Sequence, residues 1–421
     1  MKDIIYRLIA ASLASLCIFT SISCDEQVGD FASREIITAP NLYGETYPPE
    51  ERQTAPPETT PTGETVAVTE PPAPPVPKDT KVSFLACGDN LVHSNVYEDA
   101  YARGNGKYEF IHMYDDVADM IAAADLAYVN QEGPMAGASY GYSGYPLFNA
   151  PQEMGDTLVE LGFDVINVAN NHMLDQREAG LLSTIEFFKS RPITLIGGYL
   201  NKEDYDDVRV VTVNDIKIAF LSYTYGTNGL YLPAGSETVI PLLDETDMKR
   251  QTEIAKERAD IVIASLHWGN EDWFEPSESQ LYYEKVLVDC GVDVILGMHS
   301  HTLQPIKWDE REDGHKTLCI YSIGNFISTM LYARNMVGGM LTFDIVRRNG
   351  EYLIEKPLLY PTVCYYNTSR RGLQVYRMEN FTDAMASTHG SQRYGAFDVS
   401  RLRRYVTDTI SGEFLPDWIK G

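Results

Sequence analysis

Strand-like and helix-like segments alternate along this chain from Lys81 onward. The apolar run Val82–Cys87 is typical of a buried strand, and Leu126–Val129 is a second such run. Between them, Tyr108–Ala124 has apolar residues at helical spacing. Strands separated by helices pair as parallel neighbours, so this order predicts an α/β fold. The same pattern predicts helices over Pro151–Leu161, Leu181–Ser190 and Ser277–Asp289, and strands over Phe163–Ala169, Ile193–Ile196, Ile261–Leu266 and Val292–Leu296.

Other strands follow one another through short turns, which predicts antiparallel pairing. Val208–Val213 and Ile216–Tyr223 are separated only by Asn214-Asp215, which suits a hairpin turn. The remaining predicted strands are Thr317–Tyr321, Gly339–Val346 and Glu351–Leu359, with a turn at 348–350. We therefore expect a mixed sheet system in one domain over residues 80–364. Residues 365–421 form a C-terminal extension whose packing the sequence does not indicate.

The first 24 residues have the pattern of an export signal. Lys2 and Arg7 flank a short N-terminal region, and Leu8–Ile22 carries no charge but is shorter than the roughly 18–20 residues that span a bilayer. Ser21–Cys24 resembles a bacterial lipobox, so we expect an extracytoplasmic protein, lipid-anchored to the cell membrane through Cys24 and displayed at the cell surface. Ordinary cleaved secretion and an uncleaved anchor are the alternatives.

Residues 25–79 are rich in Pro, Thr and Glu and lack hydrophobic periodicity. Such a segment cannot bury enough apolar surface to offset the entropy of ordering it. We therefore expect a disordered stalk between the membrane and the folded domain.

Charge and cysteine usage exclude several classes of protein. The net charge of −26 argues against nucleic acid as a partner, because binding it requires a basic surface. A hydrophobic content of 44% excludes wholesale disorder. The cysteines that follow the signal are far apart in sequence and form no C-x-x-C pair, so we expect buried free thiols at Cys87, Cys290, Cys319 and Cys364.

Polar residues that can carry chemistry gather at the carboxyl ends of the predicted strands. Because these ends meet at one edge of an α/β sheet, residues far apart in sequence are expected to converge there. The residues in question are Asp89, His93, Asn130, Glu132, Asn170, Asn171, His172, Asp175, His267, His299 and His301.

Each of these residues also has an ordinary structural explanation. A single His at a strand end is commonly a hydrogen-bonded surface residue, Asn171 could cap a helix, and Glu132 could belong to a turn. Five of the 8 histidines lie at these strand ends, however. His299 and His301 stand two apart, and on extended backbone both rings would lie on one side.

The donor types indicate a metal site. Carboxylates, an amide oxygen and imidazoles without thiolate suit borderline divalent ions such as Mn, Fe or Zn. One carboxylate can bridge two ions about 3.5–4 Å apart, and such a pair activates water and binds a phosphoryl oxygen. This set of residues therefore predicts a hydrolase.

Several motifs together resemble the bacterial CapA family, the capsule-synthesis and poly-γ-glutamate-associated proteins of the calcineurin-like metallophosphoesterase superfamily. The resemblance covers roughly residues 81–330 and implies a sandwich of mixed sheets with helices on the outside. The motifs, in order, are Gly88–Asn90, Asn130–Gly133, Ala169–Asp175, His267–Gly269, Gly297–Pro305 and Ser322–Phe326.

The resemblance also implies a role for each residue of a site with two divalent metal ions. His172 would protonate the leaving group or steady the phosphoryl oxygens, and Asp175 would orient His172 or Asn171. Glu132 stands where the superfamily usually has a bridging Asp, and Asp89-Asn90-Leu91 replaces the usual Asp-x-His. The implied ligands are Asp89 and His301 for one ion, Asn171, His267 and His299 for the other, and Glu132 between them, with His93, Asn130 and Asn170 beside the ions.

Two functions fit this resemblance. The first is a metal-dependent hydrolase of the phosphoesterase type, acting on a phosphoester or an anionic polymer in the synthesis, release or remodelling of a surface polymer. The second is a non-catalytic accessory protein in a complex with polymer synthase or export proteins. A serine hydrolase is disfavoured, because residues 141–144 lack the G-x-S-x-G motif. Tyr140, Tyr142 and Tyr145 could form a rim over the site or fold over the domain's own surface.

Overall fold

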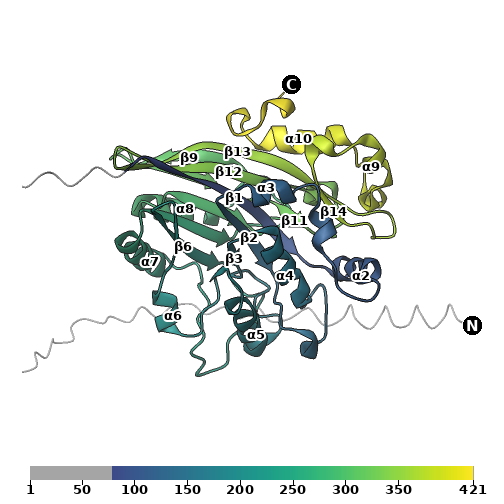
Figure 1. The fold of residues 1–421 in the computed structure, drawn as a ribbon, viewed down its shortest axis with the longest axis horizontal. Coiled ribbons are helices and arrows are strands. Elements are labelled where there is room, and N and C mark those ends of the chain that lie inside the picture. The colour runs from purple at the N-terminus through teal and green to yellow at the C-terminus, as the bar shows by residue number, and fades with distance from the viewer. Residues whose placement is uncertain (1–77, 421) are drawn as a thin grey trace, which may run out of the picture. The chain divides into compact units, whose positions relative to one another are not determined.

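Two mixed β-sheets and their flanking helices make up the computed structural model, which describes residues 78–420 (Figure 1). The predicted signal at 1–24, with Cys24, and the predicted stalk up to residue 77 lie outside the described residues. Within residues 78–420, no helix combines the length and apolar character that crossing a membrane requires.

The first sheet is built around β1 (Thr80–Leu91). This strand pairs in parallel with β2 (Leu126–Glu132) and antiparallel with β12 (Val337–Arg348). Its strand order is β14-β13-β12-β1-β2-β3-β4, with β11 paired to β1. The other strands of this sheet are β3 (Val165–Asn167), β4 (Thr194–Ile196), β11 (Asn325–Ile327), β13 (Glu351–Tyr365) and β14 (Gln374–Arg377).

The second sheet has the order β5-β6-β7-β8-β10-β9. The predicted hairpin at its edge is confirmed, with Asn214 and Asp215 at φ values of 49° and 62°, as a two-residue turn between twisted strands requires. Its strands are β5 (Arg209–Val213), β6 (Ile216–Thr224), β7 (Ile261–His267), β8 (Val294–Met298), β9 (Ile306–Glu310) and β10 (Lys316–Ile320).

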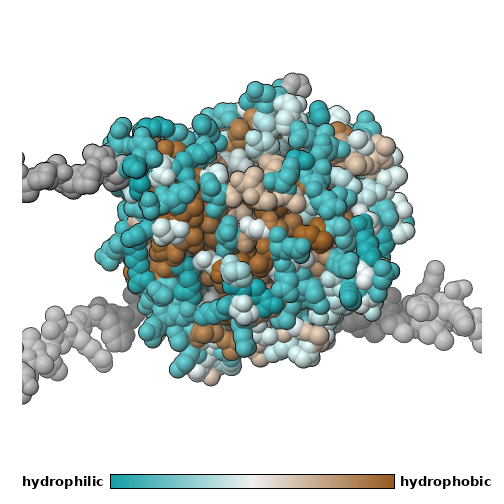
Figure 2. Space-filling view, viewed as in Figure 1, coloured by the Kyte–Doolittle hydropathy of each residue, from teal (hydrophilic) through white to brown (hydrophobic). Residues whose placement is uncertain are grey.

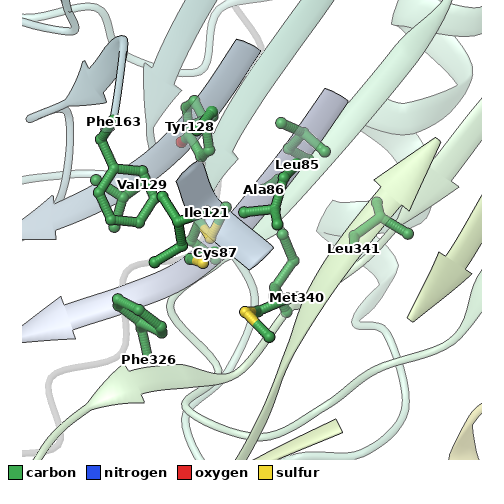
Figure 3. Close-up of a cluster of buried hydrophobic side chains, with 14 of the residues drawn as sticks. Leu85, Ala86, Cys87, Ile121, Tyr128, Val129, Phe163, Phe326, Met340 and Leu341 are labelled. Carbon is green, nitrogen blue, oxygen red and sulfur yellow. The ribbon is translucent and has the colours of Figure 1, made fainter. Parts of the chain in front are cut away.

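The two sheets share one hydrophobic core. The rings of Phe84 on β1 and Phe220 on β6 stack with centroids 6.3 Å apart. Tyr128 of β2 and Ser265 of β7 share a hydrogen bond of 2.6 Å across the same interface. Figure 3 shows part of this core, in which side chains from neighbouring strands and from the segments that cover them converge. These contacts place the two sheets face to face.

Helices cover the outer faces of both sheets. Along β6, Ile218 and Phe220 belong to the core between the sheets, whereas Ala219 and Leu221 pack in a second cluster with the helices. This alternation confirms the predicted α/β sandwich with helices on the outside. The helices are α2 (Ser94–Arg103), α3 (Ala118–Ala122), α4 (Gln152–Leu161), α5 (Arg177–Lys189), α6 (Lys202–Asp206), α7 (Glu245–Arg258), α8 (Glu278–Cys290), α9 (Asp383–Thr388) and α10 (Val399–Thr409).

The C-terminal segment, whose packing the sequence did not indicate, lies against the first sheet. Figure 1 shows α9 and α10 alongside the strands of this sheet. Leu402 and Val406 of α10 are fully buried in the main core, and β14 adds a strand next to β13. The surface seen in Figure 2 is mostly hydrophilic, with apolar residues gathered towards the middle of that face.

Two predicted elements differ from the structure. Tyr108–Ala124 is not one helix but a short 3-10 turn at 111–114 followed by α3, because Asp116 between them accepts the backbone N–H of Arg377 at 2.7 Å and is thereby tied to β14. The strand predicted over Phe163–Ala169 is limited to β3, where the Asn167 side chain accepts the N–H of Ala169 and turns the chain.

The cysteines agree with the prediction except in the burial of Cys290. All four that the structure describes are free, and Cys87, Cys319 and Cys364 are buried, while Cys290 at the end of α8 is half-buried.

Candidate metal centre

The candidate site begins within β1 and β2 rather than in the loops after them. Asp89 lies opposite Asn130 of β2 and Asn325 of β11, at a bulge in β1. Gly88 permits this bulge, because a Cβ at that position would overlap the carbonyl oxygen of Gly324. The sequence placed Asp89 and Glu132 beyond their strands, and this detail was wrong: pairing with both neighbours extends β1 to Leu91 and β2 to Glu132.

Asp89 is fully buried and held by two donors. Its Oδ1 accepts the side-chain N–H of Asn130 at 2.7 Å, and its Oδ2 accepts the backbone N–H of His299 at 3.1 Å. Asn130 in turn accepts the Nδ2–H of Asn167 at 2.7 Å. Asn130 therefore uses its amide to position Asp89.

Glu132 is buried without any hydrogen bond. Neither carboxylate oxygen has a partner among the described residues. Its Oε1 lies 3.8 Å from His267 Nε2 and 3.7 Å from His301 Nε2. Burial raises the pKa of this carboxyl well above its ordinary value, and His301 opposes the shift. A buried carboxylate without partners is strongly unfavourable, and a cation between it and the imidazoles would remove the penalty.

His299 and His301 follow β8 in an unusual backbone conformation. Their φ values are 92° and 54°, so the prediction of extended backbone was wrong. The strain is held by the Asp89–His299 hydrogen bond and by Ser300, whose carbonyl accepts the N–H of Asp272 at 2.9 Å. The two rings still lie close together, with centroids 6.0 Å apart.

His301 contacts both buried carboxylates. Its Nδ1 lies 3.0 Å from Asn325 Oδ1 and 3.3 Å from Asp89 Oδ2. Burial lowers the pKa of His301, but Glu132 and Asp89 outweigh it and raise that pKa to about 10. The two carboxylates thus make the surroundings of the His301 ring strongly negative.

His267 and Asn171 come together from opposite sheets. His267 is the last residue of β7, and its Nε2 lies 3.0 Å from Asn171 Oδ1 and its ring 4.8 Å from the ring of His299. Burial lowers the pKa of His267 and of His299 well below the ordinary value, and the neighbouring imidazoles add to the shift. Both rings are therefore neutral, the form that binds metals.

His172 and Asp175 form a separate pair beside these residues. His172 Nδ1 lies 2.8 Å from Asp175 Oδ2, which also accepts the backbone N–H of Phe148 at 2.7 Å. Asp175 was expected to orient either His172 or Asn171, and the residue it contacts is His172. His172 also lines a cavity of about 260 Å³ together with Asn171 and Tyr145.

The two remaining predicted residues lie next to the site. His93 is half-buried, and its Nδ1 accepts the backbone N–H of Thr329 at 3.3 Å. Asn170 bonds only to backbone: its amide donates to the carbonyls of Gln131 and Val168, and its oxygen accepts the N–H groups of Gly133 and His172. Asn170 thus fixes the end of β2 that carries Glu132 and the turn that carries His172.

Four residues of the site had no role assigned from the sequence. Glu271, His299 and His301 have ligand atoms within 4.8 Å of one another, as do Asp89, Glu132 and His301. Glu271 follows His267 by only four residues, and this spacing could have indicated it as a residue of the site. Asn325 positions His301, and Tyr225 places its ring 4.6 Å from that of His299, while the side chain of Asn228 contacts Asn171 at 3.4 Å. No sequence pattern pointed to the loop of Tyr225 and Asn228.

The loop that carries Tyr140, Tyr142 and Tyr145 was expected either to form a rim over the site or to fold over the domain's own surface, and the three tyrosines differ in this respect. Tyr145 is 76% exposed and borders the cavity over His172. Tyr142 instead packs against Tyr108 and Tyr97, with ring centroids 5.1 and 6.2 Å away. Tyr140 is 41% exposed and does not line this cavity. The rim position is therefore held by Tyr145.

The chain resembles known capsule proteins. The protein-family model described as bacterial capsule synthesis protein PGA_cap matches residues 83–330. The capsule biosynthesis protein CapA of Bacillus anthracis is 30% identical over 211 residues, which are 49% of this chain and 50% of that protein. The PGA biosynthesis protein CapA of Bacillus subtilis is 30% identical over 210 residues, 47% of this chain and 51% of that protein. The chain thus spans about half the length of the curated relatives it matches.

Among solved structures, the calcineurin-like phosphoesterase YfkN of Bacillus subtilis is 11% identical, with a TM-score of 0.39 and coverage of 82% of this chain and 100% of that one. A 5'-nucleotidase precursor of Thermus thermophilus is 12% identical, with a TM-score of 0.41 and coverage of 77% of this chain and 57% of that one.

The family model matches more than half of the chain and includes every residue of the candidate centre. The chain belongs to the bacterial capsule synthesis protein PGA_cap family.

Proposed function

We propose that this protein is a metal-dependent hydrolase of the phosphoesterase type that acts in the synthesis, release or remodelling of a capsule or poly-γ-glutamate-like surface polymer. Family membership supports the connection to capsules. The proposed anchor is a lipid on Cys24, which would hold the domain at the outer face of the cell membrane. Neighbouring partners would then be the proteins that synthesise or export the polymer.

The burial of the Glu132 carboxylate without a hydrogen-bond partner among the described residues is the main support for a metal site. Both of its oxygens are buried and unpartnered, and imidazole nitrogens of His267 and His301 stand 3.8 and 3.7 Å away. A buried carboxylate that faces imidazole nitrogens in this way is suited to bridging cations. We propose that Asp89 and His301 hold one divalent ion, and that Asn171, His267 and His299 hold the other, with Glu271 as a further ligand.

Bound divalent ions of this kind activate water and neutralise charge on a phosphoryl group. The protein's own groups would supply the remaining requirements. Asp175 fixes the ring of His172 through Nδ1, so that Nε2 is the atom available to give a proton to the leaving oxygen. Asn130 and Asn325 hold Asp89 and His301 in place.

Metal analysis of the purified full chain tests the site. After chelation and reloading with Mn²⁺, we expect about two ions per chain, and one or none in Glu132→Gln. Glu284→Gln is the matched control, because Glu284 is also buried but, unlike Glu132, has partners in Lys307 and Tyr321. Unchanged metal content in Glu132→Gln would contradict the proposal.

A screen of phosphodiesters, phosphomonoesters and γ-glutamyl polymers tests the chemistry. Hydrolysis should depend on added metal and fall in His172→Ala while the metal content stays constant. A fully loaded protein with no turnover on any of these substrates would favour the accessory function instead.

A further inference from the structure

A second, larger cavity opens beside the candidate metal centre. It measures about 650 Å³ and is formed by the segment that follows β6. We call it the 225–242 pocket. Its lining is mostly hydrocarbon, with Leu230, Leu232, Ile240 and Leu242 joined by the rings of Tyr225 and Tyr231. A cavity of this size and composition is typical of a site for a small organic group.

The pocket adjoins the cavity beside the candidate centre. Asn228 and Leu230 line both this pocket and the 260 Å³ cavity over His172. Tyr225, which also lines the 225–242 pocket, has its ring centroid 4.6 Å from that of His299. A group bound in the 225–242 pocket would therefore lie next to a phosphoryl group held at the centre.

The 225–242 pocket lacks the positive charge that a site for a polyanion requires. The residues that line it carry no charged side chain, and those that line the adjoining cavity include no Lys or Arg. The adjoining cavity instead carries the carboxylates of Asp175 and Glu271. A chain of carboxylates leaving the centre on this side would have to enter the uncharged, mostly apolar 225–242 pocket, which is unfavourable.

The segment around the pocket is anchored at several points. The backbone N–H of Tyr225 donates to the carbonyl of His267 at 3.0 Å, and that of Val239 donates to Tyr199 at 3.0 Å. Thr238 donates its hydroxyl to Glu178 at 3.0 Å, and its side chain is largely buried. The pocket is thus formed before a ligand binds, which lowers the entropy lost on binding.

We propose that the 225–242 pocket binds an uncharged, hydrocarbon-rich group of the substrate, attached to the phosphoryl group that reacts at the metal centre. The inference rests on the proposed function for the phosphoryl end, but the pocket itself requires no metal. It narrows the substrate to a phosphoester with an aryl or alkyl body, and it places a repeating polyanion outside this part of the site.

Binding and hydrolysis by the purified full chain test the two ends separately. Saturation-transfer NMR in the presence of a chelator measures binding of 1-naphthol, an uncharged aryl probe. We expect binding to the unmodified chain and at least tenfold weaker binding to Leu242→Asp. Leu242 is 48% exposed and lines only this pocket, so the change should be tolerated in folding. Tyr231→Asp, at a residue 83% exposed, is the second variant.

Leu353→Asp is the matched control, because Leu353 is 39% exposed on β13 and lines none of these cavities. It should bind 1-naphthol as the unmodified chain does. Absence of naphthol binding, or equal binding in Leu242→Asp and Tyr231→Asp, overturns the proposal.

Hydrolysis of methyl, butyl and phenyl phosphate and of phosphoglycolate, with Mn²⁺ present, then identifies the group. We expect kcat/KM for butyl or phenyl phosphate to exceed that for methyl phosphate by at least tenfold, and this ratio to fall towards one in Leu242→Asp. A higher kcat/KM for butyl phosphate would identify an alkyl group as the occupant of the pocket, and a higher value for phenyl phosphate would identify an aryl group. Equal rates, or a preference for phosphoglycolate, overturn the inference while the hydrolase stands. If the unmodified chain binds 1-naphthol and Leu242→Asp does not, but the unmodified chain hydrolyses none of these phosphates, the pocket is supported and the hydrolase is refuted.

Discussion

His172 Nδ1 lies 2.8 Å from Asp175 Oδ2, and this same oxygen accepts the backbone N–H of Phe148 at 2.7 Å. One carboxylate atom therefore fixes both the imidazole and the loop that borders the cavity over it. The ring of Phe148 meets the imidazole edge-on, with centroids 4.7 Å apart. Asp175 acts as a positioning residue for His172, and its other oxygen is buried without a partner.

Replacing Asp175 with Asn removes the negative charge that faces His172 and keeps the shape of the side chain. If His172 is the proton donor, kcat should fall by about 100-fold, because general acid catalysis contributes on this order. The metal content should remain that of the unmodified chain. The pH dependence of kcat checks the mechanism: a uniform loss of activity without any change in the acidic or alkaline limb would point to a merely structural role.

Gly88→Ala should damage the fold and the metal centre together. The added Cβ would overlap the carbonyl oxygen of Gly324, and the strand that carries Asp89 must shift to relieve the overlap. We expect a loss of about 3 kcal/mol in the free energy of unfolding, at the upper end of ordinary overpacking, and weaker Mn²⁺ binding.

Urea denaturation and metal titration measure these two effects. Gly412→Ala is the control, because a Cβ there meets nothing within 4 Å. Equal stability of the two variants would show that the close approach of Gly88 to Gly324 is not required.

His389 should make the protein less stable in acid. Its Nε2 donates to the carbonyl of Cys364 at 3.0 Å, its Nδ1 accepts the N–H of Ser391 at 2.9 Å, and its ring stacks on Phe397. Burial lowers the pKa of His389 to about 4, although the Cys364 carbonyl opposes the shift. The unfolded chain then binds a proton below an ordinary pKa of about 6.5, where the folded chain does not.

The stabilisation that depends on neutral His389 is therefore complete above pH 6.5 and is lost as the pH falls towards 4. The loss should reach on the order of 3 kcal/mol. His389→Gln keeps a donor and an acceptor but cannot titrate. Urea denaturation at pH 7.5 and pH 5 should show a smaller pH difference for this variant, and an unchanged difference would refute the assignment.

Removal of residues 366–421 should prevent stable folding. Val375, Leu402 and Val406 are fully buried in the main core, so their loss would expose the outer face of the first sheet to water. Circular dichroism and thermal unfolding of the truncated chain should show no cooperative transition. A truncated chain that melts as the full chain does would show that the segment is an independent addition.

Much of the site was predictable because its residues follow strands. Asp89, Glu132 and His267 lie within the last three residues of their strands and His301 lies shortly after β8, so hydrophobic runs followed by His, Asp and Glu indicate where they converge. The roles of Asn130 and Asn170 were not predictable from their positions. Both amides are used to hold other groups, which depends on which atoms happen to face them.

The sequence by itself determined the alternation of strands and helices, the family, and the residues that meet at the edge of the sheets. These follow from periodicity and residue type, which act over a few positions. Only the tertiary structure decided that His299 and His301 take positive φ values, that Glu132 is buried without a partner, and that residues 225–242 form an apolar pocket beside His172. Each of these depends on contacts between segments far apart in the chain, and local patterns carry no record of such contacts.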